Sequence, residues 1–366
     1  METRRFFIKS TIFAAPLAVA LLVEVLLLPE DAFCYRCWEA LKAASFKQWL
    51  PGPFYPDRRI ARSETGDLGH RSEYAVTRKV VWETDRFGYR AGRIDASSCA
   101  VVIVGDSCTA GSGLTQEETI AAALSRALDL PVYPYAPCKN LGYLLHDHRF
   151  HPEVIVLQKI ERKIPRLPRP ADRAGTRLSL CRTTDEAVIL MDRMAKMAML
   201  RNTRSRIRSA LGDGVYRLLT GRERPMPLPL AEVGTDDRTL FLQGAAGRAE
   251  VGADGVARCV ERIARCHEAV KARSKQFVFM PVPDKENILF RRIHGAAEPT
   301  FLTNLMARLL ERGIPCVDLQ TPYREARARG IEIYQSDDSH WSAEGVRIAA
   351  KALARKIREG VTGTRR

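Results

Sequence analysis

The sequence predicts a three-layer α/β/α domain built around a parallel β-sheet. From residue 99 onward, short apolar segments alternate with amphipathic helical segments, and the apolar segments contain few polar residues. This is the pattern of strands that are covered by helices on both faces. The chain has 366 residues, 46% hydrophobic and 28% charged, which is the composition of a folded protein with one large domain or two ordinary ones.

The local pattern of each segment justifies the elements in order. Residues 99–105 form an apolar strand, and residues 114–128 form a helix in which Thr115 and Glu118 make a capping box. Further strands are expected at 131–135, 152–160, 238–244, 276–284 and 314–319, and further helices at 256–273, 300–313 and 340–357. The stretch 161–235 is basic and interrupted by prolines, so we expect an insertion in the domain there.

An apolar run near the N-terminus predicts a transmembrane anchor. Residues 11–29 are almost continuously apolar and approach the ~20 residues needed to span a bilayer. The basic tail 1–10 before them, and Glu30 and Asp31 after them, predict a cytoplasmic tail and an extracytoplasmic domain. We therefore expect a single-pass inner-membrane protein with a periplasmic domain; a cleaved signal peptide is the alternative. Segment 30–94 is then juxtamembrane, and its aromatic residues lie at the membrane interface or pack on the domain.

The formal net charge of +15 favours an anionic partner, which could be nucleic acid, lipid headgroups or an acidic polysaccharide. The basic residues are spread over segments such as 162–170 and 201–209, and no zinc-finger, homeodomain or RNA-recognition pattern accompanies them. Nucleic acid is therefore the least favoured of the three partners.

Cysteine spacing gives no sign of a metal or redox centre. Cys34 and Cys37 form a C-x-x-C motif, but the second pair that a zinc site needs is missing, and so is the thioredoxin-like context of a redox motif. A local disulfide is the alternative for a periplasmic domain. We expect neither a metal nor a cofactor.

Ser107 is a candidate nucleophile, because it comes at the end of a buried strand in the sequence Gly-Asp-Ser. In a parallel α/β sheet, ligands bind beyond the carboxyl ends of the strands, where this serine is expected. The small residues around it leave backbone N–H groups free to face an anion. An ordinary turn residue is the alternative, and the neighbouring Cys108 is expected to pack in the core.

His340 is the candidate base for Ser107, since a serine hydroxyl is a poor nucleophile without one. It lies in a loop before the last helix and is preceded by Asp337 and Asp338. Either carboxylate could hold one imidazole nitrogen while the other nitrogen takes the serine proton. Helix capping is the alternative role for these polar residues.

The motifs resemble those of a known superfamily. Segment 101–114 resembles the first block of the SGNH (GDSL) hydrolases, and segment 337–341 resembles their last block. Other segments are similar to the SGNH-like domain of the alginate O-acetyltransferase family, whose members are envelope proteins that acetylate exopolysaccharides: 154–162, 277–290, 313–319 and 333–354. The resemblance covers about 95–355 and implies a flavodoxin-like SGNH catalytic domain over 95–358.

The resemblance implies a Ser-His-Asp triad of Ser107, His340 and one of the two aspartates. The wider superfamily spaces the acid and base as Asp-x-x-His, which maps onto Asp337. The acetyltransferases have Asp-x-His-Trp, which maps onto Asp338. Because Trp341 follows His340, Asp338 is preferred.

The superfamily's asparagine that binds the oxyanion is not evident. Asn140 and Gly142 are candidates from the second block, and Arg162 is a candidate from the third, either for the oxyanion or for an acidic sugar. An ion pair is the alternative for Arg162. Lys285 is either a substrate contact or a loop lysine, and Trp341 either stacks on a sugar ring or packs on the histidine.

The implied function is a membrane-anchored, periplasmic O-acetyltransferase that modifies a cell-envelope or exported polysaccharide through an acetyl-serine intermediate. A separate membrane protein would then deliver the acetyl groups. A carbohydrate acetylesterase and a catalytically degenerate polysaccharide-binding or scaffold protein are the alternatives.

Overall fold

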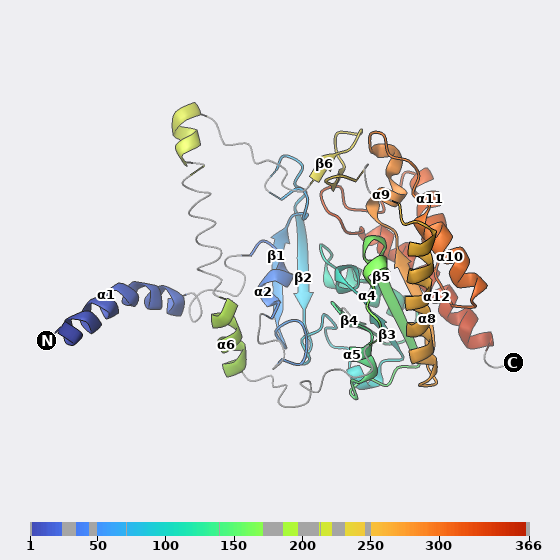
Figure 1. Cartoon of the computed structure of the whole chain (residues 1–366), viewed down its shortest axis with the longest axis horizontal. Coiled ribbons are helices and arrows are strands. Elements are labelled where there is room, and N and C mark those ends of the chain that lie inside the picture. Colours follow the sequence, from blue (N-terminus) through green and yellow to red (C-terminus); the bar gives the residue numbers. More distant parts are fainter. Residues whose placement is uncertain are drawn as a thin grey trace.

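A four-stranded parallel sheet forms the centre of the computed structural model, with the strand order β4-β3-β5-β8 (Figure 1). Its strands are β3 (Val101–Val104), β4 (Val132–Tyr135), β5 (Val154–Ile160) and β8 (Gln276–Val282). The structure describes residues 2–23, 34–43, 50–70, 72–138, 140–170, 186–196, 212, 214–221, 231–245 and 250–363. The predicted parallel α/β architecture is confirmed.

Helices cover both faces of this sheet, because successive strand residues point to opposite sides. Val101 and Ile103 belong to a core with α4 (Ile120–Leu128) and α12 (Ala343–Gly363). Val102 and Val104 belong to a second core with α8 (Ala253–Lys271) and α10 (Phe301–Glu311). Each fully buried side chain of this kind contributes about 1.5–3 kcal/mol. The three predicted layers are present.

The remaining elements are short. The helices are α2 (Cys37–Leu41), α3 (Ser107–Ala110), α5 (Gly142–Leu145), α6 (Glu186–Lys196), α9 (Lys285–Ile288) and α11 (Gln320–Ala328). Turns of 3₁₀ helix lie at Ala96–Ser98, Gln116–Glu118, Glu161–Arg166 and Phe290–Arg292, and β6 (Ala231–Val233) pairs with β7 (Leu240–Leu242). The predicted capping box of Thr115 and Glu118 is confirmed.

The strand expected at 314–319 is almost absent. Only one bridge forms there, between Cys316 and Phe279 of β8. Asp318 instead accepts a hydrogen bond from the Gln320 N–H (2.9 Å) and so starts helix α11, which the sequence analysis missed.

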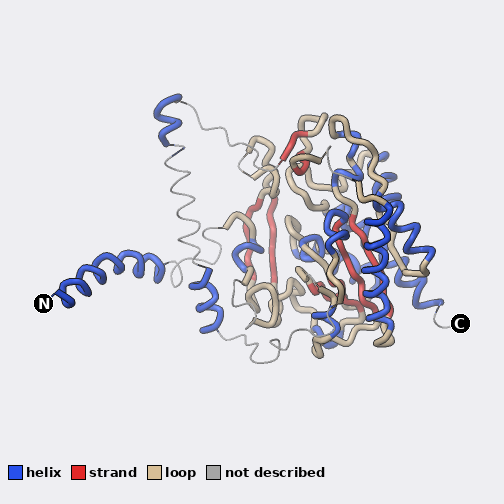
Figure 2. Tube along the Cα trace, viewed as in Figure 1, coloured by secondary structure: helices blue, strands red, loops and turns tan. Residues whose placement is uncertain are grey.

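The segment expected to be juxtamembrane is part of the folded domain. It forms an antiparallel hairpin of β1 (Arg59–Glu64) and β2 (Arg78–Glu83), which lies beside the four-stranded sheet (Figures 1 and 2). Trp82 of the hairpin packs in a small core with Phe54, Leu41 and Ala110. Of the aromatic residues for which the two roles were expected, Trp38 packs against this core and Tyr35 stacks on His70, whereas Phe33, Phe46 and Trp49 lie outside the described residues.

The expected membrane anchor is wrong. In the part of the chain that the structure describes, no helix has the length and apolarity needed to cross a bilayer. Helix α1 (Glu2–Leu22) takes in the basic residues of the tail and ends before the expected span 11–29 does, and residues 24–33 lie outside the described part. The single-pass inner-membrane location rested on that span and is not supported.

The basic insertion expected at 161–235 lies partly outside the described residues.

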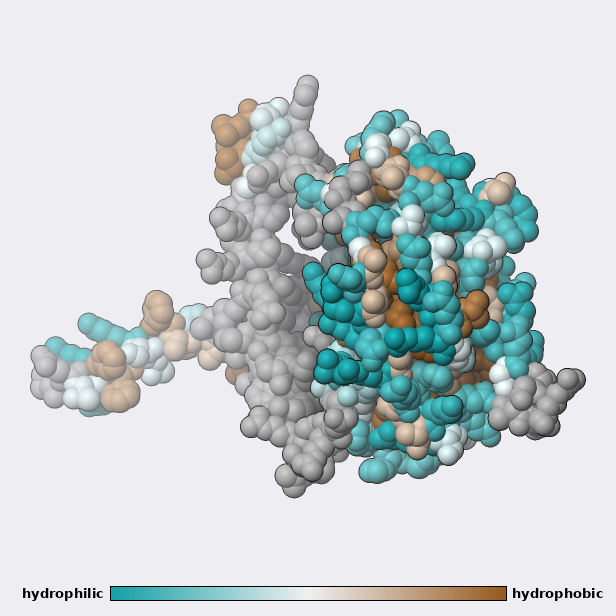
Figure 3. Space-filling model, turned by 45° about the vertical axis from the view of Figure 1, so that its right-hand side comes forward, coloured by the Kyte–Doolittle hydropathy of each residue, from teal (hydrophilic) through white to brown (hydrophobic). Residues whose placement is uncertain are grey.

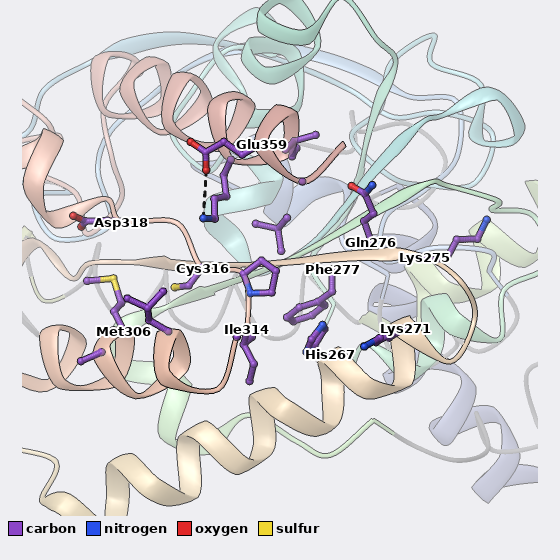
Figure 4. A pocket seen from close by; sticks show the side chains of 18 residues that line it. His267, Lys271, Lys275, Gln276, Phe277, Met306, Ile314, Cys316, Asp318 and Glu359 are labelled. Carbon is purple, nitrogen blue, oxygen red and sulfur yellow. Dashed lines mark hydrogen bonds and ion pairs between the residues drawn. The ribbon is translucent and has the colours of Figure 1, made fainter. Parts of the chain in front are cut away.

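The face of the molecule shown in Figure 3 is largely hydrophilic, with small apolar groups between polar ones. A hollow of about 730 Å³ lies at the start of β8, the end of the sheet opposite to Ser107. His267 and Lys271 of α8 border it, and Lys356 donates to Glu359 (3.4 Å) on its α12 side (Figure 4). This hollow is separate from the region around Ser107.

Arg90 joins the hairpin to the turn that follows Ser107. Its side chain is buried and lies over the ring of Trp82, 3.9 Å from the ring centre. Its guanidinium donates to main-chain oxygens of the hairpin and of the turn: Val81 (2.8 Å), Ala110 (3.1 Å), Gly111 (2.6 Å) and Leu114 (2.7 Å). These carbonyl groups are buried, so each needs its donor.

We expect Arg90→Met to lower the free energy of unfolding by at least about 3 kcal/mol, because several buried carbonyl groups lose their donor at once. Arg86→Met is the matched control. Arg86 is exposed, pairs with the exposed Asp95 (3.3 Å) and lies over the Phe87 ring (4.8 Å), so its loss is expected to cost less than about 1 kcal/mol. Urea denaturation of both variants checks this; similar midpoints for the two would show that the Arg90 contacts are not needed for stability.

Candidate active site

The turn that carries Ser107 follows β3, and close contacts with neighbouring residues and with β5 hold it in place. At Gly105, an added Cβ would lie 1.9 Å from Thr109 Oγ1 and 2.4 Å from Gln158 Oε1, so only glycine fits. The Asp106 carboxylate accepts from the N–H groups of Cys108 (3.1 Å) and Ile160 (3.2 Å). Ser107 is therefore the first residue of α3, at the carboxyl end of the sheet.

Three of the predicted site residues come together in one hydrogen-bonded series. His340 Nε2 lies 2.8 Å from Ser107 Oγ, and His340 Nδ1 lies 2.6 Å from Asp338 Oδ1. When Asp338 accepts the proton of Nδ1, the other ring nitrogen is free to accept the serine proton. The distances are those that a nucleophile, a base and an orienting acid require.

Asp337 has a different position. It forms an ion pair with Arg78 of the hairpin and accepts from the N–H groups of Gly66 (2.8 Å) and Val76 (2.9 Å). These contacts attach the loop 335–341 to the N-terminal part of the domain. Of the two aspartates that the sequence left open, Asp338 is the one that contacts His340.

Arg36 is a part of the site that the sequence analysis missed. Its buried guanidinium pairs with Asp338 Oδ2 and donates to Ser112 Oγ (2.9 Å). Burial alone would raise the pKa of the Asp338 carboxyl, but the charge and hydrogen bond of His340, together with the charge of Arg36, hold that pKa well below its usual range. The acid of the series is therefore ionised. No sequence signal links Arg36 to a loop 302 residues away.

Asp67 is a second missed neighbour of the histidine. Its carboxylate accepts from the Ser339 N–H (2.7 Å) and hydroxyl (2.6 Å), and it lies 3.8 Å from His340 Nδ1. Asp67, Asp338 and His340 are close enough together to hold a cation. Their ligand atoms are already used in hydrogen bonds, and the cationic Arg36 contacts the same cluster, so the arrangement is that of a hydrogen-bond network.

Ser107 and His340 open into a cavity of about 930 Å³. A cavity of this size holds a ligand as large as a sugar unit or more. Its aromatic lining includes Tyr35, Trp38 and Tyr143, and its basic lining includes Lys163 and Arg166. The aromatic rings offer apolar surface, and the cations favour an anionic ligand.

All three predicted oxyanion candidates make contacts with other protein groups. Asn140 lines the cavity, but its amide donates to the Arg169 carbonyl (3.1 Å) and accepts from the Gly142 N–H (2.8 Å). The Gly142 N–H is thus used as well. Arg162 forms an ion pair with Asp284 just after β8, which is the alternative role that the sequence left open for it.

Lys285 holds the loop 335–341 through hydrogen bonds to its main chain. It is buried, and its ammonium donates to the carbonyl groups of Gln335 (2.7 Å), Ser336 (2.9 Å) and Asp338 (3.1 Å). Burial lowers the pKa of Lys285 to about 8, so the side chain keeps its charge at neutral pH. It is not among the residues that line the cavity.

Trp341 and Cys108 both belong to the core. Trp341 is fully buried among residues that pack on α12 and does not line the cavity. Cys108 is also buried, and this burial raises the pKa of its thiol well above the usual value. A neutral, buried thiol is a poor nucleophile, and of the two side chains it is Ser107 that lies within hydrogen-bond distance of His340.

Two comparisons with known protein sequences give a match. Residues 233–365, which include Asp338 and His340, match the family model of the SGNH hydrolase-like domain of the acetyltransferase AlgX. Over 94 residues, or 25% of the chain, the sequence is 30% identical to the Pseudomonas fluorescens protein named "Probable alginate O-acetylase AlgJ". The match spans only about a quarter of the length of that relative (24%).

Solved structures give weak matches. A protein from Slackia heliotrinireducens assigned to the SGNH hydrolases is 14% identical, with a TM-score of 0.34, over 71% of this chain and 99% of its own. A protein from Desulfitobacterium hafniense DCB-2 assigned to the G-D-S-L family of lipolytic proteins is 12% identical, with a TM-score of 0.35, over 70% of this chain and 98% of its own. The two sequence matches, one over residues 233–365 and one over 94 residues, are to an SGNH hydrolase-like acetyltransferase domain and to an alginate O-acetylase, which is the resemblance that the sequence motifs implied.

Proposed function

We propose that the chain is an SGNH-type acyltransferase that moves an acetyl group from an acetyl ester to a hydroxyl group of a polysaccharide, through an acetyl-serine intermediate at Ser107. The observation that carries this proposal is the series Ser107–His340–Asp338, with 2.8 Å and 2.6 Å between its members. The matches to AlgX and to the AlgJ protein support a polysaccharide as the acceptor.

In the first half-reaction, Ser107 Oγ attacks the carbonyl carbon of the donor ester while its proton passes to His340 Nε2. A C–O bond forms, and the carbonyl electron pair moves to the carbonyl oxygen. When this oxyanion collapses, the bond to the donor alkoxide breaks and the alkoxide takes the proton from His340. The products are acetylated Ser107 and the free donor alcohol.

In the second half-reaction, His340 takes the proton of a sugar hydroxyl as that oxygen attacks the acetyl carbon. The bond to Ser107 Oγ breaks, and the serine recovers its proton from His340. Asp338, which is held ionised beside Arg36, stabilises the imidazolium in both halves. The Ser107 N–H, which donates to no other group in the described part of the chain, contributes to binding the oxyanion.

The choice between a sugar and water as acceptor depends on what fills the cavity when the acetyl-enzyme forms. The aromatic and basic lining described above supports a carbohydrate acceptor, and an anionic one in particular. With water as the acceptor, the same site would act as an acetylesterase.

We expect Ser107→Ala to lower kcat toward an activated acetyl ester by at least about a thousandfold, because the attacking oxygen is removed. The measurement is ester turnover with and without a polysaccharide acceptor, combined with mass spectrometry of the quenched protein for acetylated Ser107. The exposed Ser98 provides the control Ser98→Ala, which should keep wild-type turnover.

Equal turnover by the wild type and Ser107→Ala would rule out the serine mechanism. If wild-type turnover is high but the acetyl group appears only as free acetate in the presence of acceptor, the protein is an esterase.

A second prediction separates the two aspartates. We expect Asp338→Asn to lower kcat by about 10³–10⁴, because His340 then loses the acceptor that sets its tautomer. Asp337→Asn breaks the pair with Arg78 and should lower the free energy of unfolding by about 3 kcal/mol. Because Asp337 does not contact His340, kcat of the folded Asp337→Asn protein should fall less than about tenfold. The reverse order of the two kcat effects would assign the orienting role to Asp337.

A further inference from the structure

The proposed reaction needs more than one group to bind the oxyanion, and the Ser107 N–H supplies only one. The side chains expected from the sequence make other contacts: Asn140 donates to a main-chain carbonyl, and Arg162 pairs with Asp284. Another side chain with a free N–H that reaches the same cavity is therefore a candidate for the second donor.

Lys159 is such a side chain. It is the last residue but one of β5, the strand next to β3, so it lies at the same carboxyl edge of the sheet as Ser107. The residue is buried, with an exposed fraction of 6%, and it lines the cavity into which Ser107 and His340 open. A lysine in an otherwise buried strand is unusual, because burial of an ammonium group is costly unless it is paired.

The contacts of Lys159 place its ammonium near the serine turn but leave it without an anion. Its Nζ donates to the Cys138 carbonyl (3.3 Å), and the Cys138 N–H donates to the carbonyl of Gly105 (2.7 Å), two residues before Ser107. Within the described residues the Lys159 ammonium makes no ion pair and only this one hydrogen bond. An ammonium has three N–H donors, so two remain.

We propose that Lys159 is the second oxyanion donor, whose ammonium binds the carbonyl oxygen of the acetyl group as negative charge develops on it. The inference rests on the proposed acyl transfer at Ser107. It assigns to a lysine the oxyanion-binding role that Asn140, which makes protein contacts, was expected to fill. No proton needs to leave Lys159 in either half-reaction, because the ammonium acts only through its charge and its hydrogen bond.

The surroundings of Lys159 lower the pKa of its ammonium group. The titratable groups around it are Asp106, Cys138, Lys163 and Cys266. Burial lowers the pKa of Lys159 below its ordinary value, and Asp106 opposes this in part. The donor is present while Lys159 is protonated, so wild-type turnover should fall as the pH rises through this lowered pKa.

The test compares Lys159→Met and Lys159→Arg with the wild type, using 4-nitrophenyl acetate as the acetyl donor. This ester is small, so an oxyanion donor should affect kcat more than KM. We expect Lys159→Met to lower kcat by about 10²–10³, with little change in KM, and to lack the alkaline fall in turnover. Lys159→Arg keeps a cationic donor, so its kcat should be at least about tenfold higher than that of Lys159→Met. Lys271→Met is the control, because Lys271 is exposed and lies by the separate hollow at the start of β8 (Figure 4).

Ser107→Ala is measured in the same assay, so that two failures can be told apart. If Ser107→Ala turned over the ester as fast as the wild type does, the proposed function itself would be overturned. An inactive Ser107→Ala together with a fully active Lys159→Met would overturn only the role of Lys159. Thermal unfolding is measured alongside: a Lys159→Met loss that matches its loss of folded protein, with the alkaline fall retained, would assign a purely structural role to Lys159.

Discussion

Two ion pairs, one buried and one partly buried, join the N-terminal part of the domain to the loop 335–341 of the candidate active site. Arg36 pairs with Asp338 and Arg78 pairs with Asp337. Removing charges from water costs several kcal/mol per ion, so such pairs persist only where further hydrogen bonds compensate. Here, the main-chain N–H groups of Gly66 and Val76 also donate hydrogen bonds to the Asp337 carboxylate. Because the loop carries His340, the position of the base depends on the docking of the hairpin.

The sheet could be predicted because its strands are short apolar runs that alternate with amphipathic helical segments. Segment 314–319 has a similar composition but gives one bridge, since the side chain of Asp318 starts a helix before a strand can continue. The run at 11–29 was mistaken for a membrane span, and hydropathy alone does not say what will cover an apolar surface. Segment 30–94 was misassigned along with it.

The candidate site was predictable only where its residues lie in local motifs. Ser107 follows a strand, and His340 and Asp338 are two positions apart, so short patterns reveal both. Arg36 and Asp67 come from a distant segment with no motif, and only the tertiary fold brings them to the histidine. Lys159 did leave a signal, a charged residue at the carboxyl end of a buried strand, but its meaning depends on the neighbouring loop.

The separation of Ser107 and His340 along the chain has a consequence for biosynthesis. The two residues are 233 positions apart, and ribosomes add about 5–20 residues per second, so roughly ten to fifty seconds separate their synthesis. Once β5 has been made, the Gly-Asp-Ser turn can form beside β3, but the Ser107 hydroxyl still has no base. Under the proposed mechanism, the serine of the nascent chain therefore stays without its base until His340, just before helix α12, has been made.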